Sequence, residues 1–388
     1  MNIFSEVAIA GIGETKVGKI PGITGIQFQV EAARLALEDA GLSKDDVDGV
    51  CSFGGYSASM QMHALQVSEY MGMKPDFNAQ VDVGGVITPM TAIFNAASAI
   101  SSGLCNVALC TFGENASSYR PLETHGWHRG AFQGGEEFED PFGAAAIVIS
   151  YALLAQRHMY EYGTTSEQLG AVAVAARKHA CMNDNAHMRE PITLEDHQGS
   201  RIIASPLRLL DCSLISDGGG AVVLASADRA RDLRKPPISV LGFCMKSTHK
   251  IVSQAPDLDE LALWDVGRRI FEQTGLTLND VDVAEIHDAF TISTILAIEG
   301  FGLCARGEGG AYAAEGRLEL GSSLPVNTHG GLLSHAHVGG IFHLTEAVKQ
   351  LRGECGPRQV PDAQVALVTG NGGVFSICGA MLLGRGMP

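Results

Sequence analysis

The sequence has little positive charge and no long apolar run. Its 27 Lys and Arg residues stand against 43 Asp and Glu residues, which gives a formal net charge of −16. This excess of negative charge disfavours nonspecific binding to nucleic acid or to an anionic membrane. The N-terminus lacks the basic region and cleavage site of a secretory signal, and no segment reaches the length of a membrane span. We therefore expect a cytoplasmic protein without nucleic-acid or membrane partners.

Several motifs of common catalytic and metal sites are also missing. The nine cysteines are odd in number and scattered, without a CxxC pair, which argues against a disulfide framework and a structural zinc site. There is no GxSxG motif of a serine hydrolase, and "GNGG" at 370–373 lacks the Lys of a phosphate-binding P-loop. His335 lies close to His337, and Asp288 adjoins His287, but this spacing is not specific for metal ligands. No bound metal is expected.

What the sequence does contain is an internal repeat. Segments of the first 115 residues return in the same order in the last 115. The echoed pairs are "AGLSKDDVDGV" (40–50) with "TGLTLNDVDVA" (274–284), "VDVGGVITPMTAIF" (81–94) with "VNTHGGLLSHAHVGGIF" (326–342), and "VALCTFG" (107–113) with "VALVTGN" (365–371). Three echoes in one order indicate two copies of one unit.

Strand and helix patterns alternate within each copy, which predicts an α/β fold with a mostly parallel sheet between helices. Residues 1–115 with 205–230 are expected to form an N-terminal half, and residues 235–388 a C-terminal half. Residues 116–204 match neither copy and carry a Gly-rich, acidic stretch at 128–143. This block is predicted to be an inserted loop or lid domain.

Three loops that follow strands are candidates for the functional site, because ligands of open α/β sheets collect at the carboxyl ends of strands. In "VDVGGVITPMTA" at 81–92, Val86 holds the exposed elbow position where many α/β enzymes carry a nucleophile. The backbone N–H groups around it suit an oxyanion or a thioester oxygen. The second loop is "EIHDAFT" at 285–291, which contains His287, and the third is "NTHGGLLSHAHVGG" at 327–340.

The third loop adds Asn327, His329, His335 and His337 around several glycines. Two imidazoles that converge on one carbonyl oxygen polarise it and acidify the neighbouring carbon, as enolate chemistry requires. The alternative is that a single His in a loop is a hydrogen-bonded structural residue, and this applies above all to His329 and His335.

Taken together, the repeat, "HDAF", "NTHGGLLSHAHVGG" and the terminal "GNGG" resemble the thiolase superfamily, in its sterol-carrier-protein-thiolase and lipid-transfer-protein branch. The resemblance covers essentially the whole chain. It places Val86 where thiolases carry the nucleophilic Cys, and Thr369 where they carry the second Cys. His287 matches the His or Asn of the family's HDCF or NEAF motif. His337 matches the His of its GHPxGA motif, which is altered here to "AHVGGI".

The resemblance implies two α/β halves in a layered α-β-α-β-α body, with the inserted loop domain over the active site, and a homodimer formed through the first half. It also implies a coenzyme A thioester as substrate, with no bound cofactor. His287 and His337 are the expected catalytic residues. The expected substrate-binding residues are Gly85, Val86, Asn327, His335, Thr369 and Gly372.

By this resemblance both cysteine positions carry other residues, whereas His287 and His337 are kept. This combination implies carbon–carbon chemistry without an acyl-cysteine, most simply retro-aldol cleavage of a β-hydroxyacyl-CoA. Related aldolases without the Cys shorten steroid side chains together with a small OB-fold, zinc-ribbon partner. Two alternatives stay open: a thiolase or acyltransferase using another thiol such as Cys110, and a noncatalytic acyl-CoA or lipid-binding subunit. Which His is the base also stays open. Gly84, Gly85, Thr88 and the Gly-rich insertion favour an acyl group larger than acetyl.

Overall fold

The computed structural model describes residues 3–55, 61–119, 138–144, 146–255, 257–258 and 261–387. Most of the Gly-rich, acidic stretch expected at 128–143 lies outside these residues. The strands of the main sheet are β1 Val7–Glu14, β2 Gly49–Gly54, β3 Phe77–Gln80, β4 Val107–Asn115, β7 Asp217–Ser226, β8 Ile238–Ser247, β9 Val283–Glu285, β10 Val365–Gly372 and β11 Ile377–Arg385. The longer helices are α1 Gly25–Ala40, α2 His63–Met71, α3 Thr88–Ser101, α5 Ile147–Tyr162, α6 Ser166–Cys181, α9 Ala262–Thr274, α10 Thr291–Gly300 and α12 Ile341–Arg352.

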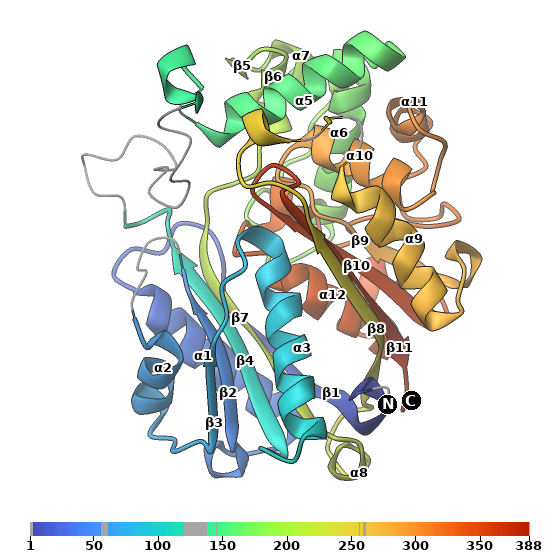
Figure 1. Ribbon diagram of the computed structural model, residues 1–388. Helices are drawn as coiled ribbons and strands as arrows, with labels where there is room; N and C mark the ends of the chain where they lie inside the picture. Colours follow the sequence, from blue (N-terminus) through green and yellow to red (C-terminus); the bar gives the residue numbers. More distant parts are fainter. Residues whose placement is uncertain are drawn as a thin grey trace.

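Apart from the edge strand β3, the strand order of the main sheet is symmetric about the β1–β8 pair. It runs β3-β2-β4-β7-β1-β8-β11-β10-β9, so from the β1–β8 pair outward, β7, β4 and β2 of the first half have β11, β10 and β9 as counterparts in the second (Figure 1). A parallel bridge from Ala284 to Val326 stands where β3 stands in the first half. The halves meet where β1 pairs with β8. This symmetry supports the repeat, while the proposed residue boundaries of the halves and the insertion stay a prediction.

The expectation of a mostly parallel sheet is wrong. β2 runs parallel to β3 and β4, and β9 runs parallel to β10, but the other five pairings are antiparallel. In the second half the reason is local: residues 373–376 join β10 to β11, and so short a connection can only turn the chain back on itself.

Alternate residues of the strands face two different apolar layers, as buried strands require. In β4, Cys110 and Phe112 pack in the central layer with residues of α3 and α12, whereas Val107 and Leu109 pack outward with α1. In β10, Val368 faces the central layer and Leu367 faces the outer layer that contains residues of α9 and α10. The result is the expected α-β-α-β-α arrangement, with α3 between the two parts of the sheet (Figure 1).

The repeated "VD" dipeptide has the same structural task in both halves. Asp48 accepts hydrogen bonds from the backbone N–H groups of Asn106 and Val107, at 2.8 and 2.7 Å, and so fixes the start of β4. Asp282 accepts from the N–H groups of Gln364 and Val365 at 2.7 and 3.0 Å and fixes the start of β10. The repeat therefore preserves an interaction that sets the register of a central strand.

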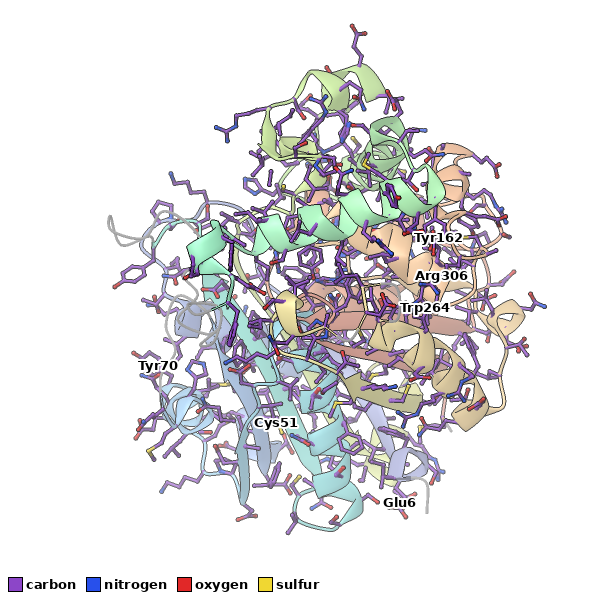
Figure 2. All side chains as sticks on the ribbon, turned by 45° about the horizontal axis from the view of Figure 1, so that its top comes forward. Glu6, Cys51, Tyr70, Tyr162, Trp264 and Arg306 are labelled. Carbon is purple, nitrogen blue, oxygen red and sulfur yellow. The ribbon has the colours of Figure 1, made fainter. Side chains whose placement is uncertain are left out.

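Between β4 and β7 the chain forms α5, α6, the short helix α7 Leu194–Gly199 and the two-stranded β5 Ile202–Ala204 and β6 Leu207–Arg208. These elements lie together at one end of the sheet (Figure 1). Figure 2 shows α5 crossing the molecule, with Tyr162 at its C-terminal end beside the second half. Among the helices that the structure describes, none has the length and apolarity needed to cross a bilayer.

We predict that Asp282→Ala lowers the free energy of unfolding by about 1–3 kcal/mol, because it leaves two strand N–H groups without their carboxylate. The control is Asp45→Ala, which removes an exposed carboxylate close to the equivalent turn of the first half and is expected to cost less than about 0.5 kcal/mol. Urea unfolding of both variants measures the difference. Equal stabilities would mean that the Asp282 hydrogen bonds do not hold β10.

Candidate active site

The elbow of the first half touches the end of β10 with backbone against backbone. Gly85 has φ +64°, and a Cβ on it would lie 2.5 Å from the carbonyl oxygen of Asn371 and 2.6 Å from Cα of Gly372. Only Gly fits there, because both the conformation and the space exclude a side chain. The two glycines expected at the site therefore bring a loop from each half together.

Val86 occupies the 3-10 turn Gly85–Ile87 that leads into α3. Its side chain is only 3% exposed, so the expected exposed elbow position is wrong. The reason is packing: a Cβ built on Gly340 would lie 2.1 Å from Val86 Cγ1, so the valine lies directly against that loop. Valine has no group that can form an acyl intermediate.

His287 follows β9 and is held by its backbone, whose N–H donates to Thr369 Oγ1 at 3.1 Å. Its ring is buried, and Nδ1 has no hydrogen-bond partner among the described residues. Burial lowers the pKa of His287 well below its usual range, and the neighbouring His337 and His343 lower it further. His287 is therefore a neutral imidazole at pH 7.

His337 is the second imidazole at this place. Its Nδ1 lies 2.9 Å from the hydroxyl of Ser213, and its backbone N–H donates to Ser216 Oγ at 3.2 Å. Burial lowers the pKa of His337 to about 4, although the charge of Asp288 opposes the shift. The structure thus brings together the elbow, Thr369, Gly372 and the two predicted catalytic histidines.

Asn327 and His335, two of the expected substrate-binding residues, are used differently. The Asn327 amide accepts from the Ile286 N–H at 2.6 Å and donates to the Ile286 carbonyl at 2.8 Å, so it clamps the segment that carries His287. His335 is 1% exposed and packs against His329 and Phe342, with ring centroids 5.2 and 4.7 Å away. We therefore expect His335 to support the site through packing and not to contact the substrate.

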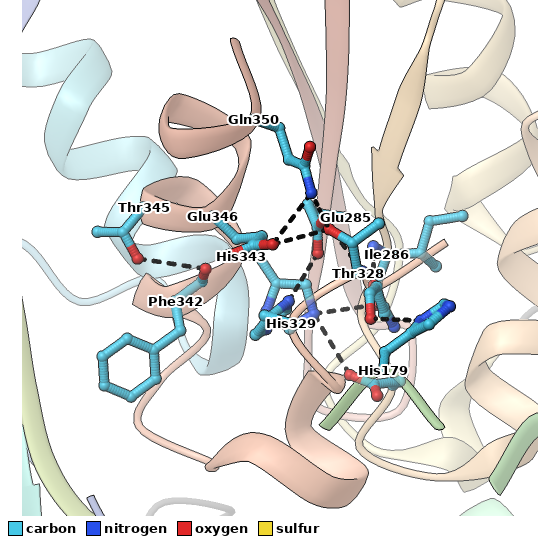
Figure 3. A network of polar contacts seen from close by, with 12 residues as sticks. His179, Glu285, Ile286, Thr328, His329, Phe342, His343, Thr345, Glu346 and Gln350 are labelled. Atoms are coloured by element: carbon cyan, nitrogen blue, oxygen red, sulfur yellow. Dashed lines mark hydrogen bonds and ion pairs between the residues drawn. The ribbon is translucent and has the colours of Figure 1, made fainter. Parts of the chain in front are cut away.

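A buried polar network lies behind the two histidine loops (Figure 3). The Thr328 hydroxyl oxygen lies 2.9 Å from carboxyl oxygens of both Glu285 and Glu346. The Thr328 hydroxyl has one proton and can donate it to only one of these carboxyl groups. The other carboxyl group must therefore be protonated and donate to the hydroxyl oxygen. Burial and the charge of Glu346 raise the pKa of Glu285, which identifies Glu285 as the protonated acid. Arg358 overcomes burial and keeps the pKa of Glu346 low.

This network also supports the His287 loop. His343 donates to the Ile286 carbonyl at 3.0 Å and lies 3.3 Å from Asp288 Oδ1. Asp288 accepts in turn from the Leu332 N–H at 2.8 Å, which connects the two histidine-bearing loops. Burial lowers the pKa of His343, but the hydrogen bond and charge of Asp288 more than compensate and raise it.

Three polar residues at the site were not among the residues predicted from the sequence: Ser213, Tyr151 and Asn371. The Tyr151 hydroxyl donates to the Gly373 carbonyl and accepts from Asn371 Nδ2, both at 3.0 Å. The signal for Asn371 was its place in "GNGG". Tyr151 lies on α5 in the predicted insertion, and nothing in the local sequence marks it as part of the site.

The alternative of another nucleophilic thiol is not supported at Cys110. Cys110 is buried, and a hydrogen bond with Cys51 together with burial raises its pKa well above the usual range. Such a thiol is a poor nucleophile. Within the described part of the chain, no group of three or more His, Cys, Asp or Glu side chains is arranged to hold a metal ion.

Comparison with known proteins gives consistent matches. Residues 244–385 match the family described as Thiolase C-terminal domain-like. The chain is 38% identical over 379 residues to "Steroid side-chain-cleaving aldolase" of Thermomonospora curvata, covering 95% of each protein. It is 37% identical to "17-hydroxy-3-oxo-4-pregnene-20-carboxyl-CoA lyase" of Mycobacterium tuberculosis, covering 95% of this chain and 97% of that protein. The solved structure "Ltp2-ChsH2(DUF35) aldolase" aligns with a TM-score of 0.90 and 36% identity over 99% of each chain.

We predict that a lower pH decreases the free energy of unfolding because of His329 and His337. The pKa of His337 is about 4 and that of His329 about 3 in the folded protein, against about 6.5 in an unfolded chain. The stabilisation is complete above pH 6.5 and is lost as the pH falls toward 4, because the unfolded chain binds protons that the folded protein does not. Replacing His337 by Gln should reduce the slope of the free energy of unfolding against pH by up to about 1.4 kcal/mol per pH unit between pH 4 and 6.5.

The control is Ser216→Ala, which removes the hydrogen bond to the His337 backbone without removing a titrating group. It should lower stability by a similar amount at every pH. Denaturant unfolding between pH 4.5 and 7 distinguishes the two variants, and an unchanged slope in His337→Gln would contradict the low pKa.

Proposed function

We propose, from the premise that this chain belongs to the thiolase superfamily in its sterol-carrier-protein-thiolase and lipid-transfer-protein branch, that it cleaves a carbon–carbon bond beside an acyl-CoA thioester by a retro-aldol reaction. The observation that carries the proposal is the pair of neutral imidazoles, the buried His287 and the partly buried His337, beside an elbow that holds Val86. The relatives named as an aldolase and as an acyl-CoA lyase support the same reaction.

The reaction needs two groups, and the site offers both. One imidazole takes the proton of the β-hydroxyl group, the bond between Cα and Cβ breaks, and Cβ leaves as an aldehyde or ketone. The electron pair of the broken bond forms the enolate of the thioester, whose oxygen is held by the N–H of the other imidazole. Return of the proton to Cα gives the shortened acyl-CoA, so no proton is gained or lost overall.

Neutral histidines suit this chemistry better than charged ones. A neutral imidazole can donate a proton from one nitrogen and accept at the other, whereas a protonated ring cannot act as a base. Burial keeps both rings neutral at pH 7, and it also excludes water, which strengthens a hydrogen bond to a developing negative charge. Nothing in this sequence of steps uses a thiol, and we propose that no cofactor is bound.

The proposed substrate is a bulky β-hydroxyacyl-CoA, with a shortened steroid side chain as the first class to test. The two relatives whose names specify steroid substrates support this choice. We further propose a cytoplasmic homodimer that works with a small OB-fold, zinc-ribbon subunit. The second component named in the matched "Ltp2-ChsH2(DUF35) aldolase" structure supports such a subunit.

The test is turnover of a panel of β-hydroxyacyl-CoA and β-ketoacyl-CoA thioesters, followed by mass spectrometry of the products and of the intact chain. It is run with and without free CoA, and with and without the candidate partner. We expect cleavage to a carbonyl compound and a shorter acyl-CoA, independent of free CoA and without an acyl adduct. His287→Gln and His337→Gln should each lower kcat/KM by at least about 100-fold while the chain stays folded.

Two outcomes would replace the proposal. Cleavage that requires free CoA, together with an acyl adduct on the chain, would show a thiolase that uses another thiol. Tight binding of the thioesters without turnover, even with the partner present, would show a noncatalytic acyl-CoA-binding subunit. Turnover of acetoacetyl-CoA alone would contradict the bulky acyl group.

A further inference from the structure

We propose that Glu285 acts as a neutral carboxylic acid that positions the two histidine-bearing loops, and that loss of its proton ends thioester cleavage at high pH. Glu285 is the last residue of β9, two residues before His287, and its side chain is fully buried (Figure 3). The role in cleavage rests on the proposed function, whereas the place of the proton follows from the hydrogen bonds alone.

The Gln350 amide donates to the Thr328 hydroxyl, and other partners fix the orientation of that amide. The backbone N–H of Val360 can only donate, so the atom 2.8 Å from it is Gln350 Oε1. The Arg358 carbonyl can only accept, so the atom 2.9 Å from it is Nε2. Nε2 also lies 2.9 Å from Thr328 Oγ1. The Thr328 oxygen therefore accepts one hydrogen bond and keeps its own single proton to donate.

Two carboxyl groups compete for the Thr328 proton. Oxygens of Glu285 and Glu346 each lie 2.9 Å from Thr328 Oγ1, so Thr328 donates to one carboxyl group and the other must donate to Thr328. Arg358 identifies the charged one, because its Nε and Nη2 each lie 3.0 Å from a Glu346 oxygen. Within the described ranges no Lys or Arg side chain pairs with Glu285. The shared proton therefore belongs to Glu285.

The other titrating groups around Glu285 agree with this assignment. His329 Nδ1 lies 2.8 Å from Glu285 Oε2, but the pKa of His329 is about 3, so this ring carries no charge at pH 7. Burial, and then the charge of Glu346, raise the pKa of Glu285, and His343 on α12 opposes only part of this shift. Both the contacts and the charges keep Glu285 neutral.

The neutral acid joins the two loops close to their histidines. Asn327 has φ +55°, in the left-handed region, and its amide clamps Ile286. Thr328 is the next residue, and its hydroxyl and backbone N–H lie 2.9 and 3.3 Å from Glu285 Oε1. Glu285 therefore anchors the residue that follows a left-handed turn, and this turn sets the backbone beside His287.

Loss of the Glu285 proton removes this anchor. Thr328 can then donate to only one of two carboxylates, and the second charge is left in an interior where like charges repel strongly. Arg358 already holds Glu346 at two points, so Glu285 is the group that must move. The two loops then lose their connection, and the histidines no longer converge on one thioester.

The first test needs no substrate. The infrared difference spectrum between the wild type and Glu285→Gln at pH 7 should contain the C=O stretching band of a buried, protonated carboxyl group. Glu315→Gln is the matched control, since Glu315 is an exposed glutamate of the second half, and its difference spectrum should lack this band. A spectrum of Glu285→Gln that shows only the loss of a carboxylate would overturn the proposal.

The second test compares the two carboxyl groups by denaturant unfolding. In Glu285→Gln the amide can still donate to Thr328, so at pH 7 this variant should unfold at a denaturant concentration no lower than the wild type. Glu346→Gln removes the charge that Arg358 pairs with and should unfold at a lower concentration. The reverse order would overturn the assignment of the proton.

The pH dependence of unfolding has a definite sign. The folded protein keeps the Glu285 proton above the pH of about 4.3 at which an unfolded chain loses it. The unfolding equilibrium constant of the wild type should therefore rise with pH, relative to that of Glu285→Gln, by up to about tenfold per pH unit until Glu285 ionises in the folded protein. A ratio that does not change with pH would contradict the neutral acid.

The third test is the pH profile of thioester cleavage. The wild-type kcat should fall on the alkaline side, and Glu285→Gln should lack this fall while it keeps at least about a tenth of the wild-type kcat at pH 7. Glu285→Ala cannot reach Thr328 and should lower kcat by about 10- to 100-fold with little change in KM. An alkaline fall that persists in Glu285→Gln, or equal losses in both variants, would overturn the positioning role.

The tests also separate this role from the proposed function. If the wild type cleaves no thioester, the proposed function fails, and the infrared and unfolding measurements alone decide whether Glu285 is a neutral acid that joins the loops.

Discussion

The backbone contact between Gly85 and residues 371–372 is the constraint on which the site depends. It joins the elbow of one half to the strand end of the other at a distance that no side chain would allow. Because β10 also carries Thr369, whose hydroxyl accepts from the His287 N–H, the same strand fixes the elbow and the first histidine together. The start of β10 is set in turn by Asp282, so an interaction far from the chemistry determines the geometry at the site.

Burial then determines what the positioned groups can do. The site is made of neutral imidazoles, an amide and hydroxyl groups, and burial is the first cause of the low pKa values of both His287 and His337. Groups of this kind act through the direction of their hydrogen bonds and not through their charge. The charged groups lie behind them, where Arg358 neutralises Glu346 and Asp288 holds His343. The network therefore supplies rigidity to the loops that carry His287 and His337, whose proposed roles need neutral imidazoles.

The sequence predicted the parts of this structure that depend on local patterns. Alternating strand and helix patterns predicted an α/β fold, and the echoed "VD" dipeptide marked two aspartates with one structural task. It could not predict contacts that arise only when distant segments meet. Tyr151 approaches Asn371 across 220 residues of chain, and no periodicity encodes such an approach. Asn327 and His335 share a loop with His337, but the fold of that loop directs the Asn327 amide to the Ile286 backbone and the His335 ring to His329.

An elbow that carries valine limits the reactions that the remaining groups can support. In a covalent thiolase reaction the thiol receives the acyl group, and the polarising groups assist it. With Val86 packed against Gly340, an enolate can still be stabilised, but its formation depends on a base placed near the β-carbon. A neutral imidazole can serve as that base, because one of its two ring nitrogens carries no proton. In the proposed reaction the elbow then needs no nucleophilic side chain, because no bond to the protein is formed.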